Sequence, residues 1–502
     1  MTKQAKWMWL LLAVITAGSA YANIENQYIK GDDMPNSLVY LPLPPDSTAL
    51  AGNGDYARWI WGKTMRDTPR GEQASWESKY GIVRMCTIYS DVLGIEITED
   101  DTPAIYRLMR KAGDTGSASV SLMKSIYFRK RPFVIMNEDT WGQFDRYNEL
   151  SVSSAYPSSH TGFGWGTALA LAEMAPHLQD TILRRGYEYG ISRVIVGAHW
   201  QSDVDAAMLC ASAAIARSHA TPEYQADMAA ARAEYMQLKG LSESDMKASF
   251  PVITKILDAP PTIDEYCFSG DLFSHWQAKE LRSTERGAQA DADVSIADDY
   301  LINAFAECSP VVTISESETP YIVMLIKTLK LSLNSHATSL KGMTQRKRPY
   351  VQFNEPYTHD SEAWQHYSES SFPSRHAMIG WGLALALTEI MTDCQNEILK
   401  RGYEYGESRI IKGSGYATDM QAARIMAACD MSKLHNEPMF KTLFEYAKQE
   451  YKQKLDEAGI ESVIATSRLN DTLWYSIKGE IYNSKPATPG IYINNGKKVM
   501  IK

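Results

Sequence analysis

Two histidines and an aspartate in the first half of the chain could carry out the transfer of a phosphate group. His199 and Asp203 stand four residues apart, a spacing that would place them on one face of a helix. The carboxylate could then hold one ring nitrogen and leave the other free to attack phosphorus, which gives a phosphohistidine intermediate. His160 could donate a proton to the departing oxygen. These three residues form the predicted catalytic group.

A phosphate group also needs partners that neutralise its charged oxygens. The first half of the chain contains basic and hydroxyl side chains suited to this task, and arginine offers a planar set of N–H donors. The turn into the helix that follows His160 could add backbone N–H groups. The predicted phosphate ligands are Lys124, Arg131, Ser158, Ser159 and Arg193. Because these side chains do the neutralising, we expect no metal and no cofactor.

The second half of the chain repeats the first. Residues 185–190 and 401–406 both read RGYEYG, and the offset is 401 − 185 = 216. A repeat unit of this length is a whole domain rather than one turn of a solenoid. We therefore expect two tandem domains, at residues 23–240 and 241–456.

The second copy lacks one predicted catalytic residue. Gly415 stands where the first copy has His199, since 415 − 199 = 216. Glycine has no side chain and cannot form a covalent intermediate. The other predicted site positions persist, as Lys341, Arg348, Ser374, His376, Arg409 and Asp419. The second copy is therefore predicted to be non-catalytic, with a basic site that could still bind an anion.

Helices must position these residues. After Asp203, apolar side chains recur at the three- and four-residue spacing of a buried helix face. Residues 161–175 are small and apolar, and residues 226–239 and 440–456 form charged, amphipathic patterns that would close each copy. Strand-like alternation is scarce. The predicted fold class is all-α, with two tandem helical bundles.

The start of the chain has the pattern of a secretory signal. Lys3 and Lys6 precede an apolar run, and residues 20–22 read AYA, which matches a cleavage site. Residues 1–22 are therefore predicted to be removed, and the mature protein is expected to be exported to the periplasm, the cell surface or the medium. A membrane anchor is the alternative, but the run is short for a span.

Residues 457–502 form a C-terminal tail outside the repeat. Apolar and polar residues alternate there around Asn495-Gly496, a pattern typical of a β-hairpin. The tail resembles the C-terminal sorting tails of type IX secretion cargo. A small hairpin packed on the second domain is the alternative.

The composition excludes some partners. A net charge of −9 argues against a general binder of nucleic acid or of anionic membranes. No later stretch reaches about 18 apolar residues, so no membrane span is predicted. The six cysteines would meet an oxidising compartment as disulfides or as buried thiols. The matching positions in the two copies suggest the pairs Cys86–Cys210 and Cys308–Cys429.

The motifs Lys-x6-Arg-Pro, Pro-Ser-x-His and Ser-Arg-x5-His-x3-Asp together resemble the signature of the type 2 phosphatidic acid phosphatase superfamily. Residues 66–71 and 186–207 resemble, more narrowly, bacterial class A nonspecific acid phosphatases. The resemblance implies an all-α bundle and metal-independent hydrolysis of small phosphomonoesters at acid pH, with His199 as nucleophile and His160 as acid. It also implies oligomers, so the two copies could form a pseudo-dimer within one chain.

The chain departs from the family pattern at one position in each copy. Ser159, and Arg375 in the second copy, stand where the family usually has glycine, which lets the backbone approach a phosphate closely.

Other functions are alternatives to a phosphatase. A vanadate-dependent haloperoxidase could use the same basic site in a related fold. A non-catalytic phosphate-binding surface protein is a third alternative, against which the intact His160, His199 and Asp203 argue. Residues 66–71 and 199–203 favour the phosphatase.

Overall fold

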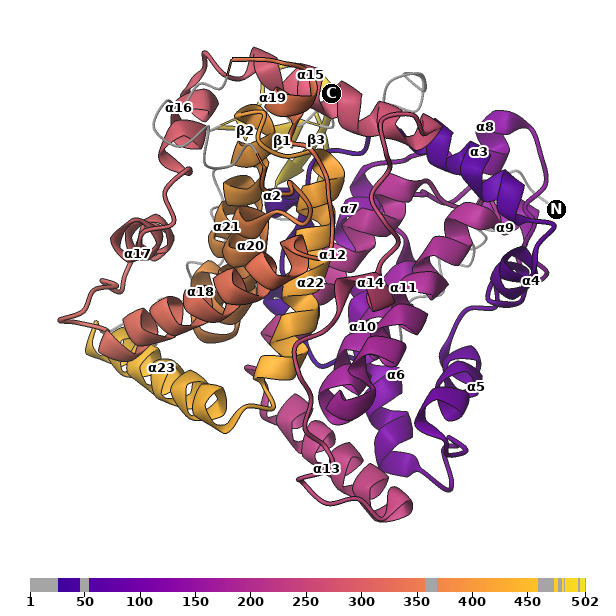
Figure 1. Cartoon of the computed structure of the whole chain (residues 1–502), viewed down its shortest axis with the longest axis horizontal. Helices are drawn as coiled ribbons and strands as arrows, with labels where there is room; N and C mark the ends of the chain where they lie inside the picture. The colour runs from indigo at the N-terminus through magenta and orange to yellow at the C-terminus, as the bar shows by residue number, and fades with distance from the viewer. Residues whose placement is uncertain are drawn as a thin grey trace, which may run out of the picture.

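A computed structural model describes most of the chain, and the predicted signal at residues 1–22 lies outside the described residues. Helices make up nearly all of the regular secondary structure of the described residues, as predicted (Figure 1). Among the residues that the structure describes, no helix is both long enough and apolar enough to cross a membrane. The described residues are 26–45, 54–356, 368–458, 474–476, 481–482, 484–494 and 497–501.

The first half is a bundle around helix α10 (Ser159–Met174), which contacts α6 (Pro103–Ala118), α11 (Gln179–Ile195) and α12 (Gln201–Ser218). Small residues let these helices approach closely: a Cβ at Gly116 would lie 2.2 Å from the carbonyl oxygen of Gly162. The surrounding helices are α2 (Ser37–Tyr40), α3 (Asp55–Met65), α4 (Pro69–Trp76), α5 (Ile82–Leu93), α7 (Ser121–Ile126), α8 (Pro132–Met136), α9 (Tyr147–Leu150) and α13 (Pro222–Lys239).

The second half has helices at matching positions. Helix α20 (Arg375–Ile390) begins 375 − 159 = 216 residues after α10, and α21 (Gln395–Ile411) and α22 (Ala417–Leu434) follow α11 and α12 at the same offset. Helix α23 (Pro438–Glu457) corresponds to α13, so the helices predicted at the end of each copy are confirmed. The remaining helices are α14 (Ile253–Ile256), α15 (Ser269–Glu280), α16 (Glu285–Ala292), α17 (Asp298–Ala306), α18 (Pro320–Lys341) and α19 (Pro349–Gln352).

The two halves share one hydrophobic core. Helices α12 and α22 lie side by side at the centre of the molecule, and α12 also contacts α20 (Figure 1). Buried apolar side chains from both halves belong to the same cluster, among them Leu169 and Leu387. The boundary between the halves is therefore a packed interface, which buries apolar surface as a domain core does.

Short segments of each half pack on the other half. Helix α2 contacts α21, and α14 contacts α11. The backbone N–H of Asn36 donates to Asn396 Oδ1 at 2.8 Å, and that of Val252 donates to Asp180 Oδ1 at 3.1 Å. These bonds correspond to each other, since 252 − 36 = 216 and 396 − 180 = 216. We call residues 33–41 and 249–257 the exchanged arms.

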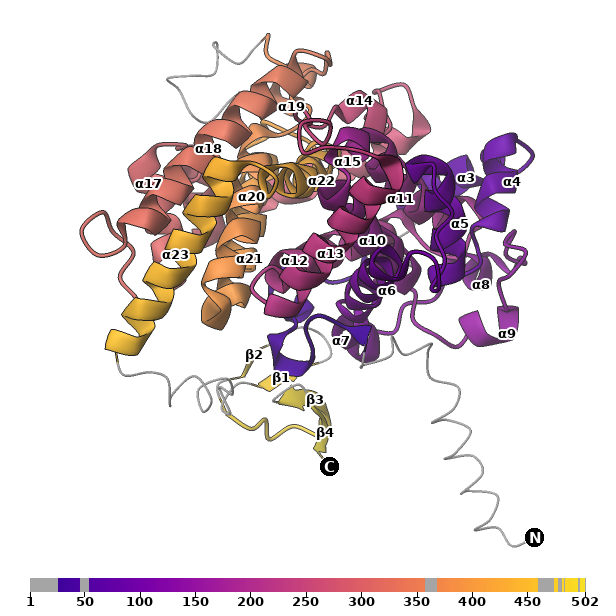
Figure 2. The ribbon, with the colours of Figure 1, turned by 90° about the horizontal axis from the view of Figure 1, so that it is seen from below.

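The C-terminal tail forms a small antiparallel sheet outside the helical bundles, with strand order β2-β1-β3-β4 (Figure 2). Strands β3 (Gly490–Asn494) and β4 (Lys497–Ile501) pair with Asn494 opposite Lys497, which confirms the predicted hairpin. Strands β1 (Trp474–Ser476) and β2 (Ile481–Tyr482) extend it.

The suggested disulfides are wrong, because all six cysteines are free thiols. Cys86 and Cys210 are buried on α5 and α12, and burial raises the pKa of Cys86 to about 11 and that of Cys210 to about 12. These thiols therefore stay protonated and behave as small apolar side chains of the core.

Candidate active site

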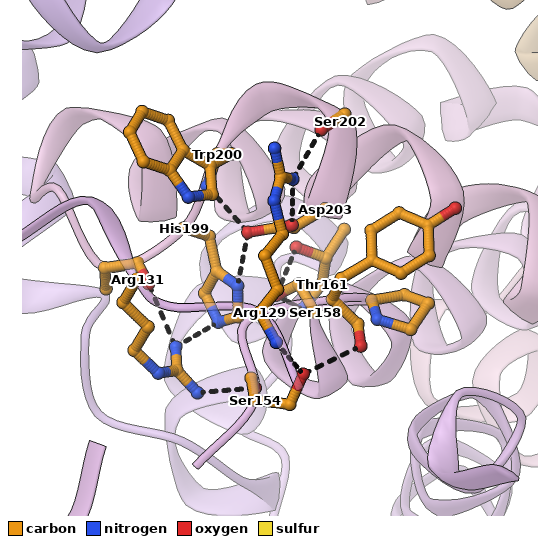
Figure 3. Close-up of polar contacts among 12 residues, drawn as sticks. Arg129, Arg131, Ser154, Ser158, Thr161, His199, Trp200, Ser202 and Asp203 are labelled. Atoms are coloured by element: carbon orange, nitrogen blue, oxygen red, sulfur yellow. Dashed lines mark hydrogen bonds and ion pairs between the residues drawn. The ribbon is translucent and has the colours of Figure 1, made fainter. Parts of the chain in front are cut away.

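The predicted residues of the first half come from one end of α10, α11 and α12 and from the nearby loops, and Figure 3 shows Arg131, Ser158, His199 and Asp203 among them. Each residue stands at a helix end or in the loop beside it, where side chains can converge on one point. Lys124 lies at the end of α7, Arg131 precedes α8, Ser158 caps α10, Arg193 lies in the last turn of α11, and Asp203 lies in the first turn of α12.

The prediction that His199 and Asp203 share a helix face is wrong. Helix α12 begins at Gln201, so His199 lies in the loop before it. Asp203 instead caps the helix, since its Oδ2 accepts the backbone N–H of Trp200 at 2.8 Å. The same oxygen lies 3.4 Å from His199 Nδ1, close enough for an ionic contact but without hydrogen-bond geometry.

The contacts of His199 define its tautomer. Arg131 Nη1 lies 2.7 Å from His199 Nε2. A guanidinium can only donate, so Nε2 must be the unprotonated nitrogen and Nδ1 must carry the proton. The nitrogen that attack on phosphorus requires therefore has a free lone pair, and Arg131 has to move from it when a phosphate binds.

Arg129 holds Asp203 in place, and the sequence prediction missed it. Its guanidinium donates to Asp203 Oδ1 at 2.6 Å and to Asp55 Oδ2 at 2.7 Å, and all three side chains are buried. In the second half Arg346 donates to Asp419 and Asp271 in the same way. The repeated arginine, two residues before each Arg-Pro pair, was the available signal in the sequence.

Arg193 and His160 present buried polar atoms that no described residue satisfies. Arg193 Nη2 donates to Asp145 Oδ1 at 2.7 Å, whereas its Nε and Nη1 have no partner among the described residues. His160 Nε2 is likewise buried without a partner in that part of the chain. Leaving the two donors of Arg193 unsatisfied costs about 1–3 kcal/mol each, which a phosphate oxygen would recover. The arrangement is suited to binding an oxyanion.

Lys124 and Ser158 mainly hold the loop that leads into α10. Lys124 Nζ donates to the carbonyl oxygens of Ser154 at 2.6 Å and Pro157 at 2.9 Å. Ser158 Oγ accepts from the N–H of Thr161 as the helix cap. Ser159 does not have a positive φ, so the replacement of glycine costs no backbone strain there.

Burial lowers the pKa of both histidines far below the usual range of the side chain. For the pKa of His160 the positive charge of Arg193 adds to the effect of burial, and for that of His199 the positive charge of Arg131 does so. The ring of His160 also stacks on that of Tyr189, with ring centres 4.2 Å apart. Both rings are therefore held neutral in the structure without phosphate.

The second site is filled by the protein's own side chains. Glu369, which stands 216 residues after Ser153, accepts from Arg348 at 2.8 Å and from Arg375 at 3.3 Å. A Cβ at position 415 would lie 2.4 Å from Met420 Cε, so the end of the methionine would have to move before a histidine could stand there. His376 Nε2 lies 3.0 Å from the carbonyl oxygen of Val294, which makes it the donor of that bond.

Five of the six predicted residues of this second site line a cavity of about 20 Å³, and the sixth, Asp419, accepts from Arg346 instead. A cavity of that size holds about one water molecule and no phosphate. Burial lowers the pKa of Lys341 there to about 7. The glutamate thus supplies the negative charge that the basic side chains would otherwise take from a ligand.

Comparisons with known proteins point to one family. The model of the PAP2 superfamily matches residues 115–226, which include the site of the first half. A non-specific acid phosphatase of Providencia stuartii is 40% identical over 213 residues, which cover 42% of this chain and 86% of that protein. A non-specific acid phosphatase of Salmonella typhimurium is 33% identical over 232 residues, which cover 46% of this chain and 92% of that protein. An acid phosphatase of Zymomonas mobilis is 32% identical over 197 residues, 39% of this chain and 74% of that protein.

Proposed function

The chain belongs to the PAP2 superfamily, and from this premise we propose that its first half is the catalytic unit of an exported acid phosphatase that hydrolyses small phosphomonoesters. The observation that carries this proposal is the unprotonated Nε2 of His199, which lies in a buried site with the unsatisfied donors of Arg193. A nucleophile beside an oxyanion site is what phosphoryl transfer requires. Export rests on the predicted signal at residues 1–22.

The proposed reaction has two steps. First, His199 Nε2 forms a bond to phosphorus while the bond from phosphorus to the ester oxygen breaks, and His160 gives that oxygen its proton. Asp203 faces the Nδ1 side of the ring and stabilises the positive charge that develops there. Second, water attacks the phosphohistidine, His160 takes a proton from the water, and phosphate leaves. Arg131 and Arg193 stabilise the charge on the phosphate oxygens in both steps.

Hydrolysis of p-nitrophenyl phosphate is expected to have an optimum below about pH 6.5, the usual pKa of histidine. Attack needs neutral His199, so activity falls when the pH drops through the pKa of His199. Proton donation needs charged His160, so activity falls when the pH rises through the pKa of His160. Since burial lowers both pKa values, both limbs move towards acid. The measurement is kcat/KM against pH.

The same assay separates the alternative functions. Vanadate should inhibit hydrolysis competitively, because it occupies the phosphate site. Oxidation of bromide by peroxide in the presence of vanadate, without hydrolysis, would instead favour a haloperoxidase. No turnover of either kind would favour a phosphate-binding surface protein, and an alkaline optimum would contradict the roles assigned to His160 and His199.

We further propose that residues 23–240 and 241–456 form a pseudo-dimer in which the second unit is non-catalytic. Support comes from the matching positions of α10–α12 and α20–α22 and from the exchanged arms, whose hydrogen bonds correspond under one offset. Such reciprocal contacts are typical of a symmetric dimer interface. The filled site around Glu369 supports the loss of catalysis.

Phosphohistidine is expected at His199 and nowhere in residues 241–456. The second half has no nucleophile at position 415, and the Nε2 of His376 donates to a carbonyl oxygen rather than offering a lone pair. The measurement is mass spectrometry of protein quenched during turnover, with His199→Asn as the control. A phosphate trapped on any residue of 241–456 in the parent protein would show that the second half is catalytic.

Rebuilding the second site extends this prediction. In a His199→Ala background, Gly415→His alone should restore no phosphohistidine, because Met420 and Glu369 fill the site. Adding the residues of the first half, Met420→Val, Glu369→Ser and Arg375→Ser, should make trapping at position 415 detectable. Equal trapping in the single variant would mean that the filling side chains do not block the site.

A further inference from the structure

A cluster of histidines and glutamates joins the two halves at the end opposite the candidate active site. Glu173 on α10 and His219 at the end of α12 belong to the first half. Glu389 on α20 and His435 at the end of α22 are their counterparts, since 389 − 173 = 216 and 435 − 219 = 216. All four side chains are at least nine-tenths buried. The cluster therefore lies inside the interface and belongs to both halves.

The two imidazole rings are arranged as metal ligands usually are. His219 Nδ1 lies 2.9 Å from the carbonyl oxygen of Ile215, and His435 Nδ1 lies 2.8 Å from that of Met431. Each Nδ1 must donate in such a contact, so the proton of the neutral ring is on Nδ1 and the lone pair is on Nε2. A hydrogen bond from the second ring nitrogen to a backbone carbonyl is the common support of a metal-bound histidine.

The Nε2 atoms face carboxylates. His219 Nε2 lies 2.8 Å from Glu173 Oε2, and His435 Nε2 lies 2.8 Å from Glu389 Oε2. The ligand atoms of Glu173, His219 and His435 all lie within 4.8 Å of one another. Tyr224 donates to Glu173 Oε2 at 3.2 Å. The carboxylate of Glu173 thus shares one small volume with the two ring nitrogens, and that of Glu389 contacts one of them.

The charges of the cluster favour a bound cation. The buried carboxylates of Glu173 and Glu389 lie beside two imidazole rings that stack with centres 3.8 Å apart. A divalent ion bound there would offset the negative charge of both carboxylates. Lys448, the other cation nearby, already pairs with Glu389 Oε1 at 2.6 Å.

We infer that Glu173, His219 and His435 bind a divalent transition metal ion, with Glu389 completing the site across the interface. Nitrogen and carboxylate oxygen ligands in this number suit Zn²⁺. Tetrahedral zinc sets its ligand atoms about 3.3 Å apart. His219 Nε2 and Glu173 Oε2, which are 2.8 Å apart, must therefore separate slightly, while the wider pairs within the 4.8 Å group close. The metal links the two halves and takes no part in the reaction.

The distance to the candidate active site supports a structural role. Asp203 and His219 lie near opposite ends of α12, 219 − 203 = 16 residues apart. At 1.5 Å per residue this separation is about 24 Å. Loss of the ion should therefore weaken the association of the halves and leave the chemistry at His199 unchanged.

The test is a zinc titration of the full mature chain without a histidine tag, after treatment with EDTA. We expect one Zn²⁺ per chain, a higher Tm with zinc than without it, and visible absorption bands when Co²⁺ is used instead. His219→Gln and His435→Gln should each weaken zinc binding at least about 10-fold. The control is His177→Gln, which changes a partly exposed histidine outside the cluster.

Three outcomes would overturn the site. They are no stoichiometric zinc binding by the parent protein, zinc binding of unchanged affinity in both glutamine variants, and equal weakening in His177→Gln. The parent protein alone decides the first, so a variant that fails to fold does not block the test. Hydrolysis of p-nitrophenyl phosphate should be within about twofold before and after EDTA; its loss would count against the metal-free mechanism at His199 and not against the zinc site.

Discussion

His199→Ala is expected to lower kcat for p-nitrophenyl phosphate at least about 10³-fold, because it removes the atom that we propose attacks phosphorus. The other basic side chains of the site are assigned or bonded differently: His160 is the proposed acid, the guanidinium groups can only donate, and Lys124 is bonded to two carbonyl oxygens. Folding should persist, because Arg131 keeps its bonds to the carbonyl oxygens of Leu150 and Ala198. The measurement is steady-state kinetics alongside circular dichroism.

Two further variants make this result specific. The double variant His160→Ala/His199→Ala should be no less active than His199→Ala, because the two side chains serve the same step. His376→Ala changes the counterpart of His160 in the second half and should leave kcat within about twofold of the parent. Activity of His199→Ala within a few-fold of the parent would exclude His199 as the nucleophile.

Arg129→Gln should have the largest effect on stability, a loss of about 3–5 kcal/mol in the free energy of unfolding. The substitution leaves the carboxylates of Asp55 and Asp203 buried without their cation. Asp203 also loses the contact that orients it towards His199, so kcat should fall as well, by about 10-fold or more. The measurements are urea unfolding and steady-state kinetics on the same preparation.

Arg346→Gln provides the matched control within the same chain. Arg346 makes the corresponding ion pairs, with Asp271 at 2.6 Å and Asp419 at 2.5 Å. Its loss should destabilise the protein by a similar amount and leave kcat nearly unchanged, because the second site lacks a nucleophile. An equal loss of kcat in both variants would mean that Arg129 acts only through general stability.

The sequence predicted the helices well, because they depend on short spacings, and the residues predicted for the first site lie close together in the structure. The apolar spacing after Asp203 reports directly on the buried face of α12, and the motifs around His160 and His199 fall at helix ends where side chains converge. The role of Arg129 could not be predicted, because its partners Asp55 and Asp203 are each 74 residues away in the sequence. Contacts between residues so far apart in the chain are set by tertiary packing rather than by local spacing.

The arrangement of the two halves could not be predicted, for a different reason. A repeat offset relates equivalent residues, but a contact between Asn36 and Asn396 has the same repeat pattern as one between Asn36 and Asp180. The sequence therefore did not distinguish an arm that folds back on its own half from one that packs on the other. The cysteine pairs failed similarly, because matching positions say nothing about whether two thiols lie within bonding distance.

The exchanged arms also bear on ancestry. In an assembly of two identical subunits, every substitution appears in both active sites at once, so a change such as glycine at the nucleophile position would inactivate the whole assembly. When both units are encoded by one gene, each site mutates separately. The arms hold the two units together through α2 on α21 and α14 on α11, whatever happens to either site. Gly415, Glu369 and Met420 could thus accumulate under selection that acted on His199 alone.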